Sequence, residues 1–490
     1  MVPEAGPWQI GWWRDAPRAQ RRTVQFAAAS AVAGVVIATG AVAAAGPWDG
    51  GQRKAERARA AAWVRPGNGE DGAGRAGQEA GAPPVLGALR GAGGGGAAAR
   101  GEGLAGALEP LLGDSALGSE HAASVVDAAS GRQLYGSGED TSYTPASTIK
   151  LATAAAALAA LGPEHRIETT VVAGTDGIVL VGGGDPTLTA LPPGKDGGPR
   201  SASLADLADA TARSLKARGT TRTRLAYDAS RYSGPAQHPI GTNDNIAPVS
   251  ALMIDEGRLD DSDRGPAGRT SDPAGDAARA FAGLLRDRGV DVEGEPAEGR
   301  ADGKAARVAA VASPPLADLV ERTLTNSDND IAEALARQTA LASGQPASFE
   351  GAAKAVMGRL AGLGLPMEGV RIADGSGLDR ADQVTARFLT GLLARTAAPD
   401  AARLRPVLTG LPVAGFSGTL RDRYPRESAG RATVRAKTGT LTGVNTLAGT
   451  AVTPSGRLLA FAFLASDTSS ADAAQQALDR LAAAVAVSGG

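Results

Sequence analysis

The hydrophobic pattern divides the chain into an apolar N-terminal stretch, a long segment without periodicity, and a periodic remainder. Residues 24–45 carry no charge and are almost entirely apolar, a length sufficient to cross the ~30 Å core of a bilayer. Residues 46–103 are rich in Gly, Ala, Arg and Glu and show no apolar period, which predicts a disordered tether. We therefore expect folded sequence to begin near Leu104.

Four arginines precede the apolar stretch, so the positive-inside rule places residues 1–23 in the cytoplasm and the rest of the chain outside it. A cleavable signal peptide is the alternative, because residues 43–45 are three alanines that offer a cleavage site. The apolar core of a signal usually runs only ~7–15 residues, and a buried soluble helix does not account for the flanking arginines. We expect an exported chain with a retained membrane anchor at residues 24–45.

The remainder mixes both periods of secondary structure. A hairpin is expected from two short alternating runs around a Ser-Gly turn, and three successive strands are expected near the C-terminus. The predicted strands are 123–127, 131–135, 433–437, 446–452 and 458–464. Helical runs are predicted at 151–161, 274–288, 327–342, 385–397 and 470–487. Between about 166 and 311 the sequence mixes short strands and glycine turns with one clear helix, 274–288.

Composition excludes several classes of function. The formal net charge of -2 over 490 residues argues against nucleic acid, which would require a basic face. The chain has no cysteine, which excludes disulfides, thiol catalysis and cysteine-based metal sites. The three histidines, His121, His165 and His238, lie far apart without a metal-binding spacing, and we expect each to be an ordinary surface or half-buried residue. No metal or cofactor is expected.

Lysine is rare and placed selectively. Only seven of the fifty basic residues are lysines, and the rest are arginines, which cannot lose a proton at a useful pH. Lys150 is the only lysine with a serine three positions before it, Ser147. These two side chains would project from the same face within one helical turn, where the amine can take the serine proton. The helix N-terminus would add a positive dipole end for an oxyanion.

Two further motifs follow in the same order along the chain. Ser327-Asp328-Asn329 precedes a helix, and its plainer interpretation is an N-cap, since these residue types are preferred there. Lys437-Thr438-Gly439 follows a β-type run, and a strand with hydroxyls and a lysine can bind an extended peptide and its carboxylate. Each motif is ordinary alone, but their conjunction is the signature of β-lactamases and penicillin-binding proteins.

The chain resembles the class C low-molecular-mass penicillin-binding proteins, the D-alanyl-D-alanine carboxypeptidase/endopeptidase family. Beyond the three motifs the resemblance covers five segments: 182–188, 247–252, 374–378, 415–420 and 437–449. The 176 residues between Lys150 and Ser327 match this family, which carries inserted domains there, better than a class A β-lactamase. Asp379 stands where the family often has serine.

The resemblance implies an α+β fold: a serine DD-peptidase/β-lactamase-like transpeptidase domain with an antiparallel sheet flanked by helices. This catalytic domain would comprise residues 104–165 and 316–490. A strand-rich inserted region, residues 166–315, would separate the first motif from the second.

The resemblance also implies roles for the motif residues. Ser147 would be the acylated nucleophile and Lys150 its base. Ser327 and Asn329 would lie opposite them, with Lys437 supplying charge beside Lys150 and Ser327. Two neighbouring lysines disfavour each other's protonation, which would help Lys150 to accept a proton.

Substrate binding is implied at the third motif. Thr438 and Thr440 would contact the substrate carboxylate, and Gly439 would let a backbone approach closely. The oxyanion hole would use the backbone N–H groups of Ser147 and Thr440.

The implied reaction is attack on the D-Ala-D-Ala bond of peptidoglycan stem peptides through an acyl-enzyme, inhibited by β-lactam antibiotics, at the outer face of the bacterial membrane. Cleavage of D-Ala–diaminopimelate crosslinks is the related endopeptidase activity. The alternatives are a non-catalytic penicillin-binding or wall-binding protein, against which the intact motifs argue, and a β-lactamase-like hydrolase. No Gly-x-Ser-x-Gly elbow is present for a Ser-His-Asp hydrolase.

Overall fold

The computed structural model describes residues 97–191 and 201–488. The predicted anchor, residues 24–45, lies outside these residues, as does most of the predicted tether. No helix in the described part of the chain combines the length and the apolarity that a membrane span requires. Residues 97–103, assigned to the tether from sequence, instead form the start of helix α4 (Ala97–Leu112). The helix is Ala-rich at its start, and Leu104 and Leu108 are buried, so packing of its second half accounts for the earlier beginning.

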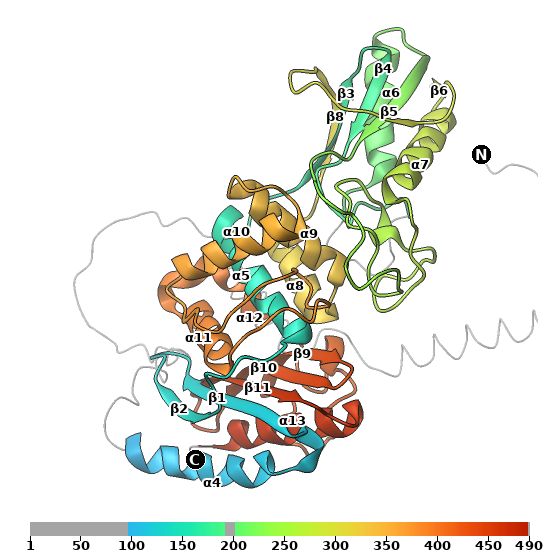
Figure 1. Cartoon of the computed structure of the whole chain (residues 1–490). Coiled ribbons are helices and arrows are strands. Elements are labelled where there is room, and N and C mark those ends of the chain that lie inside the picture. Colours follow the sequence, from blue (N-terminus) through green and yellow to red (C-terminus); the bar gives the residue numbers. More distant parts are fainter. Residues whose placement is uncertain (1–96, 192–200, 489–490) are drawn as a thin grey trace, which may run out of the picture. The chain divides into compact units, whose positions relative to one another are not determined.

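A five-stranded antiparallel sheet, here called the first sheet, holds both ends of the described sequence together (Figure 1). Its strand order is β2-β1-β11-β10-β9. The strands are β1 (Glu120–Asp127), β2 (Gln133–Ser137), β9 (Val434–Leu441), β10 (Val444–Val452) and β11 (Leu458–Ser466). The predicted hairpin and the three C-terminal strands are therefore present. However, β9 does not stop at Lys437 as predicted, but continues through the whole Lys-Thr-Gly-Thr stretch.

Both faces of the first sheet are covered, and the alternation along β11 shows how. Phe461 and Phe463 pack into a core cluster with α4 and α13, while Ala460, Ala462 and Leu464 pack into a second cluster on the other face. Helix α13 (Ala471–Val487) lies with α4 on the first side (Figure 1). The second side is covered by α5 (Lys150–Leu161), α8 (Leu316–Asn326), α9 (Asn329–Ala342), α10 (Phe349–Gly362) and α11 (Ala386–Ala397). Short turns η6 (Pro399–Leu404) and α12 (Pro406–Thr409) complete this layer.

Residues between the first and second motifs form another sheet with its own core. Its strand order is β6-β5-β4-β3-β8, with β7 also pairing with β5, and it mixes antiparallel with parallel pairs. The strands are β3 (Glu168–Ala173), β4 (Gly177–Val181), β5 (Arg222–Asp228), β6 (Asp291–Val292), β7 (Ala297–Glu298) and β8 (Arg307–Ala312).

Two helices pack on this second sheet, α6 (Leu204–Ala217) and α7 (Pro273–Asp287). Leu207 and Phe281 from these helices join Leu180 and Leu225 of the sheet in a third hydrophobic cluster. The sequence predicted α7 but not α6, although α6 buries residues at helical spacing. Helices α8 and α10 were also not predicted. We keep the name inserted region for residues 166–315.

Candidate active site

The first motif lies where a tight turn becomes a helix. Ser147 belongs to the 3-10 turn η4 (Ala146–Ile149), and Lys150 is the first residue of α5. The Lys150 Nζ donates a hydrogen bond to the Ser147 Oγ at 2.9 Å, so the predicted pairing within one turn is present. Ala146 has a φ of 46°, a left-handed conformation that costs an alanine energy. This local strain presents the half-buried Ser147 at the surface of the site.

Lys150 is wholly buried and its amine is fully engaged. Besides Ser147, the Nζ donates to the Asn329 Oδ1 at 2.7 Å and to the Ser376 carbonyl. Burial lowers the pKa of Lys150 to about 8, although the nearby carboxylate of Asp374 opposes the shift. An amine with this pKa exchanges its proton near neutral pH, as a general base for a serine hydroxyl must.

One residue of the second motif caps α9, and the other two contact the lysines of the first and third motifs. Asp328 is the N-cap of α9 and accepts the Ile331 N–H at 2.9 Å, so the capping role falls on the middle residue. Ser327 ends α8 in a left-handed conformation with a φ of 60°. Because Asp328 caps the helix, the side chains of Ser327 and Asn329 are free to face the first motif.

The third motif supplies a second pair of hydroxyl and amine. The buried Lys437 of β9 donates from Nζ to the Ser327 Oγ at 2.8 Å and to the Thr438 carbonyl at 2.8 Å. Burial, together with the positive charge of Lys150, holds the pKa of Lys437 well below its ordinary value. The expected mutual effect of the two lysines therefore falls on Lys437. The site thus contains two serine–lysine pairs, Ser147–Lys150 and Ser327–Lys437.

The strand edge after Lys437 contains the three residues predicted to bind substrate. Thr438 is half-buried and hydrogen-bonds the Thr419 hydroxyl at 2.9 Å, while Thr440 is exposed. Gly439 is buried, and a Cβ there would lie 2.6 Å from the Pro145 carbonyl oxygen. Its lack of a side chain therefore lets β9 pack against the turn that carries Ser147. The sequence interpretation had assigned that space to an approaching ligand backbone.

Comparison with known proteins identifies the family. The family described as D-Ala-D-Ala carboxypeptidase 3 (S13) matches residues 104–263 and 260–485, most of the chain. The chain belongs to the D-Ala-D-Ala carboxypeptidase 3 (S13) family. The predicted family and enzyme class, a serine D-Ala-D-Ala carboxypeptidase among the penicillin-binding proteins, are confirmed.

Named relatives agree with this membership. A carboxypeptidase of Mycobacterium tuberculosis is 38% identical over 380 residues, covering 74% of this chain and 80% of the relative. Carboxypeptidase DacB of Mycolicibacterium smegmatis is 38% identical over 394 residues, covering 78% and 83%. The crystal structure of penicillin binding protein 4 from Haemophilus influenzae has a TM-score of 0.63 at 22% identity, covering 77% of this chain and 98% of that one. This structural likeness confirms the predicted α+β fold.

The loop 374–379 of this S13 chain contacts the first motif and the helix that follows it. The sequence analysis had assigned no role to this loop. The loop 374–379 contains the Asp-Gly-Ser-Gly-Leu segment noted in the resemblance, and its Ser376 carbonyl accepts a hydrogen bond from Lys150. Thr153 of α5 also donates to the Gly375 carbonyl at 2.8 Å. Asp379, which departs from the family's usual serine, accepts the Ala381 N–H at 2.9 Å and so keeps a turn-forming side chain.

The inserted region reaches the site directly. The Asn245 carbonyl accepts a hydrogen bond from the Asn329 Nδ2 at 2.9 Å, which orients the Asn329 Oδ1 toward Lys150. The next residue on α9, Asp330, accepts the Ala247 N–H at 2.9 Å and pairs with the Arg269 guanidinium at 3.1 Å. The sequence did offer a signal for this contact, because segment 247–252 resembles the family. However, the resemblance assigned no role to that segment.

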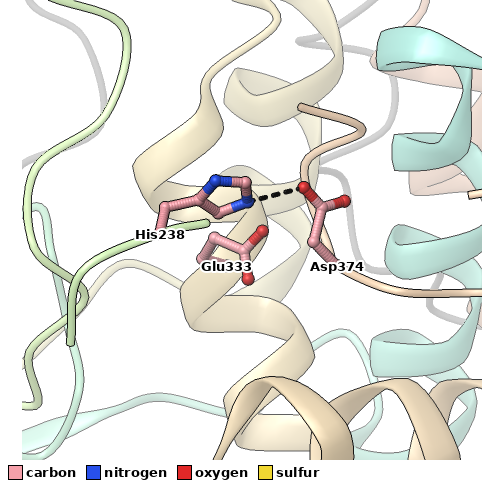
Figure 2. A group of neighbouring side chains, drawn as sticks. All are labelled: His238, Glu333 and Asp374. Atoms are coloured by element: carbon pink, nitrogen blue, oxygen red, sulfur yellow. Dashed lines mark hydrogen bonds and ion pairs between the residues drawn. The ribbon is translucent and has the colours of Figure 1, made fainter. Parts of the chain in front are cut away.

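The expectation for His238 was wrong. Its side chain is fully buried, and its Nε2 lies 2.8 Å from the Asp374 Oδ2, with Glu333 of α9 beside them (Figure 2). His238 comes from the inserted region and Asp374 from the loop 374–379, 136 residues later. Sequence spacing could not bring these two residues together, because only the docking of the inserted region does so.

Within residues 97–191 and 201–488, two groups of side chains have the composition of a metal site: His238 with Glu333 and Asp374, and Glu256 with Asp328 and Asp330. In the first group both Asp374 oxygens already accept hydrogen bonds from backbone amides. In the second group Glu256 pairs with Arg258 and Arg322. Protein donors and cations thus already engage Asp374 and Glu256, while the Glu333 Oε2 has no hydrogen-bond partner among the described residues.

Proposed function

We propose that the carboxypeptidase reaction proceeds through an acyl-enzyme on Ser147, with Lys150 as its general base. The Ser147 Oγ attacks the carbonyl carbon of the penultimate D-alanine as its proton passes to the Lys150 Nζ. The observation that carries this proposal is the 2.9 Å contact between these atoms, combined with a lysine pKa lowered to about 8. The Asn329 amide orients the lysine by accepting one of its hydrogens.

Collapse of the tetrahedral intermediate requires a proton for the leaving amine. We assign this transfer to Ser327, which gives its hydroxyl proton to the amine and recovers one from the Lys437 Nζ, 2.8 Å away. The proton that Lys150 took from Ser147 then replaces the one lost by Lys437, which leaves Lys150 neutral again. The terminal D-alanine then leaves as a free amino acid, and the penultimate D-alanine remains as an ester on Ser147. In hydrolysis of the ester, the attacking water gives a proton to the neutral Lys150 Nζ and its oxygen bonds to the carbonyl carbon. The Ser147 Oγ leaves and takes that proton back, which restores the resting enzyme.

The same proposal assigns binding of the peptide to β9. Thr438 and Thr440 contact the terminal carboxylate, and backbone N–H groups of Ser147 and Thr440 form the oxyanion hole. Gly439 contributes by holding this strand against the turn of Ser147, which fixes the distance between nucleophile and strand edge.

We also propose the wider setting of the enzyme. Residues 104–165 and 316–490 form the catalytic domain, and residues 166–315 form an inserted domain with its own sheet and core. The apolar stretch 24–45 anchors the chain at the outer face of the membrane, where stem peptides of peptidoglycan are the substrate. β-Lactams are the expected inhibitors, since a solved complex of the Haemophilus influenzae protein contains one.

The first test is labelling of the purified full-length chain with fluorescent penicillin, comparing wild type with Ser147→Ala. We expect stable labelling of the wild type and none of the variant. A well-folded wild type that takes no label would overturn the proposal and favour a non-catalytic wall-binding protein. Rapid loss of the label would instead indicate a β-lactamase.

The substrate is tested separately by two assays with the same pair of proteins. Release of free D-alanine from a peptide ending in D-Ala-D-Ala measures the carboxypeptidase reaction. Cleavage of a D-Ala–diaminopimelate crosslinked dimer measures the endopeptidase reaction. Both activities should disappear in Ser147→Ala if one acyl-enzyme serves them.

A further inference from the structure

His238 forms a directed contact from the inserted region to the loop 374–379. Its Nδ1 accepts the Ile240 N–H at 3.1 Å, so in this geometry the proton of the neutral ring is on Nε2. The Nε2–H therefore donates to the Asp374 Oδ2 at 2.8 Å. His238 also packs edge-on against the Phe349 ring, with 5.2 Å between centroids, which fixes the orientation of the imidazole.

Asp374 organises the loop that it begins. Its carboxylate accepts the backbone N–H groups of four successive residues, at 2.6–3.1 Å, and the Ser376 hydroxyl at 2.9 Å. These four residues are Ser376, Gly377, Leu378 and Asp379. Gly377 has a φ of 83°, and a Cβ there would lie 2.1 Å from the Ala146 carbonyl oxygen. The loop is thus wrapped around one carboxylate and pressed against the turn of Ser147.

The charges around His238 come from two elements. Asp374 and Asp379 belong to the loop, and Glu333 belongs to α9. Arg337 of α9 lies over the Phe349 ring and acts on Glu333. Burial opposes a charge on His238, but the hydrogen bond and charge of Asp374 outweigh it and raise the pKa of the imidazole. Burial also raises the pKa of Glu333 to about 7. Asp374, by contrast, keeps its negative charge, because its many donors hold its pKa far below the ordinary value.

Asp382, which lies next to Asp374, is a protonated carboxyl group. Burial and the neighbouring Asp374 carboxylate raise the pKa of Asp382 to about 10, so Asp382 is neutral at physiological pH. Of the buried pair Asp374 and Asp382, Asp374 is therefore the charged carboxylate, and His238 is the side chain from the inserted region that donates to it.

We propose that His238 is a positioning residue for the catalytic lysine: by donating to Asp374 it fixes the loop whose Ser376 carbonyl holds the Lys150 amine. The inserted region would then do more than flank the cleft, because one of its side chains sets the geometry of the general base. The inference rests on the proposed role of Lys150. It predicts an effect on the chemical step, since His238 does not touch the reacting atoms.

Two substitutions separate the hydrogen bond from the presence of the ring. His238→Gln places an amide N–H near the position of Nε2 and keeps the donor to Asp374. His238→Asn keeps an acceptor for the Ile240 N–H near the position of Nδ1 but cannot reach Asp374. His165→Asn, the same change at a half-buried histidine outside this group, is the matched control.

The experiment measures kcat and KM for D-alanine release, and the rate of acylation by fluorescent penicillin, from pH 6 to 10 on the full-length chain. We expect kcat of His238→Asn to fall at least tenfold with little change in KM, because small displacements of a catalytic group cost up to ~100-fold. His238→Gln and His165→Asn should stay within about threefold of wild type. The pH midpoint of acylation should move downward in His238→Asn alone, because Lys150 loses an acceptor that favours its charged form.

Several results would overturn the inference. One is a kcat of His238→Asn equal to that of wild type. Another is an equal decrease of kcat in folded His238→Asn and His238→Gln. If His238→Asn does not fold, the decision rests on His238→Gln, whose wild-type kcat and pH midpoint would support the hydrogen bond and whose loss would refute it. Inhibition of wild type by EDTA, reversed by Zn²⁺ and absent in His238→Gln, would replace positioning with a metal site.

Failure of the proposed function would look different. In that case the wild type itself would take no label at Ser147, and no comparison among the histidine variants would be possible. A labelled wild type with an unaffected His238→Asn variant rejects only the positioning role.

Discussion

The first sheet with its helices and the inserted region contribute to the site in opposite ways. The first supplies every motif residue: Ser147, Lys150, Ser327, Asn329 and Lys437. The inserted region supplies no motif residue, yet its Asn245 carbonyl holds Asn329 and its His238 meets Asp374. One region thus carries the reactive groups, and the other supports the residues that orient them.

The difference shows that chemistry and orientation can have separate origins in one chain. The motif residues lie on the first sheet and the helices that cover it, or next to them, with Lys150 at the start of α5 and Lys437 within β9. Contacts from the inserted region reach α8, α9 and the loop 374–379. Substitutions in the two regions should therefore affect different quantities.

The largest effect should follow a change in the region that carries the reactive groups. Lys150→Met removes the proposed base, and we expect the acylation rate to fall by about 10²–10⁴-fold, the usual contribution of a general base. Lys354→Met, at an exposed lysine of α10, is the matched control and should leave the rate unchanged. The measurement is the second-order rate constant for labelling by fluorescent penicillin. A Lys150→Met variant that acylates at the wild-type rate would mean that another group is the base.

A change at the ion pair between Arg269 of the inserted region and Asp330 of α9 should reduce the stability of the fold instead. Arg269→Met leaves Asp330 without its cation in a pair whose side chains are 3% and 2% exposed. We expect the free energy of unfolding in urea at pH 8 to fall by about 3 kcal/mol. Arg279→Met, in a pair that is half exposed, should cost less than about 1 kcal/mol.

The pH dependence of the Arg269→Met effect follows from Asp330. Burial and the neighbouring Asp328 charge raise the pKa of Asp330 to about 7. When a carboxyl has a higher pKa in the folded state than in the unfolded state, the free energy of unfolding falls as the pH rises toward the folded-state pKa. The loss in Arg269→Met should accordingly be smaller at pH 6, where Asp330 can be neutral, than at pH 8. An equal loss at both pH values would show that Asp330 does not titrate in this range.

The smallest effect on the acylation rate should come from a change at Asn329, which contacts both Lys150 and the inserted region. Asn329→Asp keeps an acceptor for Lys150, removes the donor to Asn245, and adds a negative charge 2.7 Å from the amine. An adjacent opposite charge favours protonated lysine, so the pH midpoint of acylation should rise from near 8 by at least about one unit. The rate at high pH should recover toward that of wild type. An unchanged pH midpoint of acylation in Asn329→Asp would show that the ionisation measured is not that of Lys150.

The sequence predicted the region of reactive groups well, because its signals are local. The Ser147–Lys150 spacing, the caps around Asp328, and the alternating strands of the first sheet all depend on neighbours within a few residues. The continuation of β9 through Gly439 was missed, because glycine ordinarily weakens a strand, and here the close packing against Pro145 requires it.

The supporting contacts were not predictable in the same way. His238 meets Asp374 and Asn245 meets Asn329 across long stretches of sequence, and neither contact leaves a periodic signal. A lone histidine in a loop is usually exposed, which is why His238 was misjudged. Helix α6 is a different case, because its buried positions 204, 207, 208, 211, 212 and 215 carry a helical period that the sequence does show.

Strand β9 is the last strand of its sheet, and such edges tend to recruit other chains. Residues 412–414 cover the first part of this edge, where the Ala436 N–H donates to the Pro412 carbonyl and the Ala414 N–H to the Val434 carbonyl. Among the described residues, no strand other than β10 pairs with the part from Lys437 to Leu441. The unprotected edge is therefore confined to the few residues that the proposed site uses, too short a stretch to nucleate sheet-to-sheet aggregation readily. A short open edge of this kind is compatible with pairing to the extended peptide of the proposed reaction, and it offers little length for pairing with a second copy of the chain.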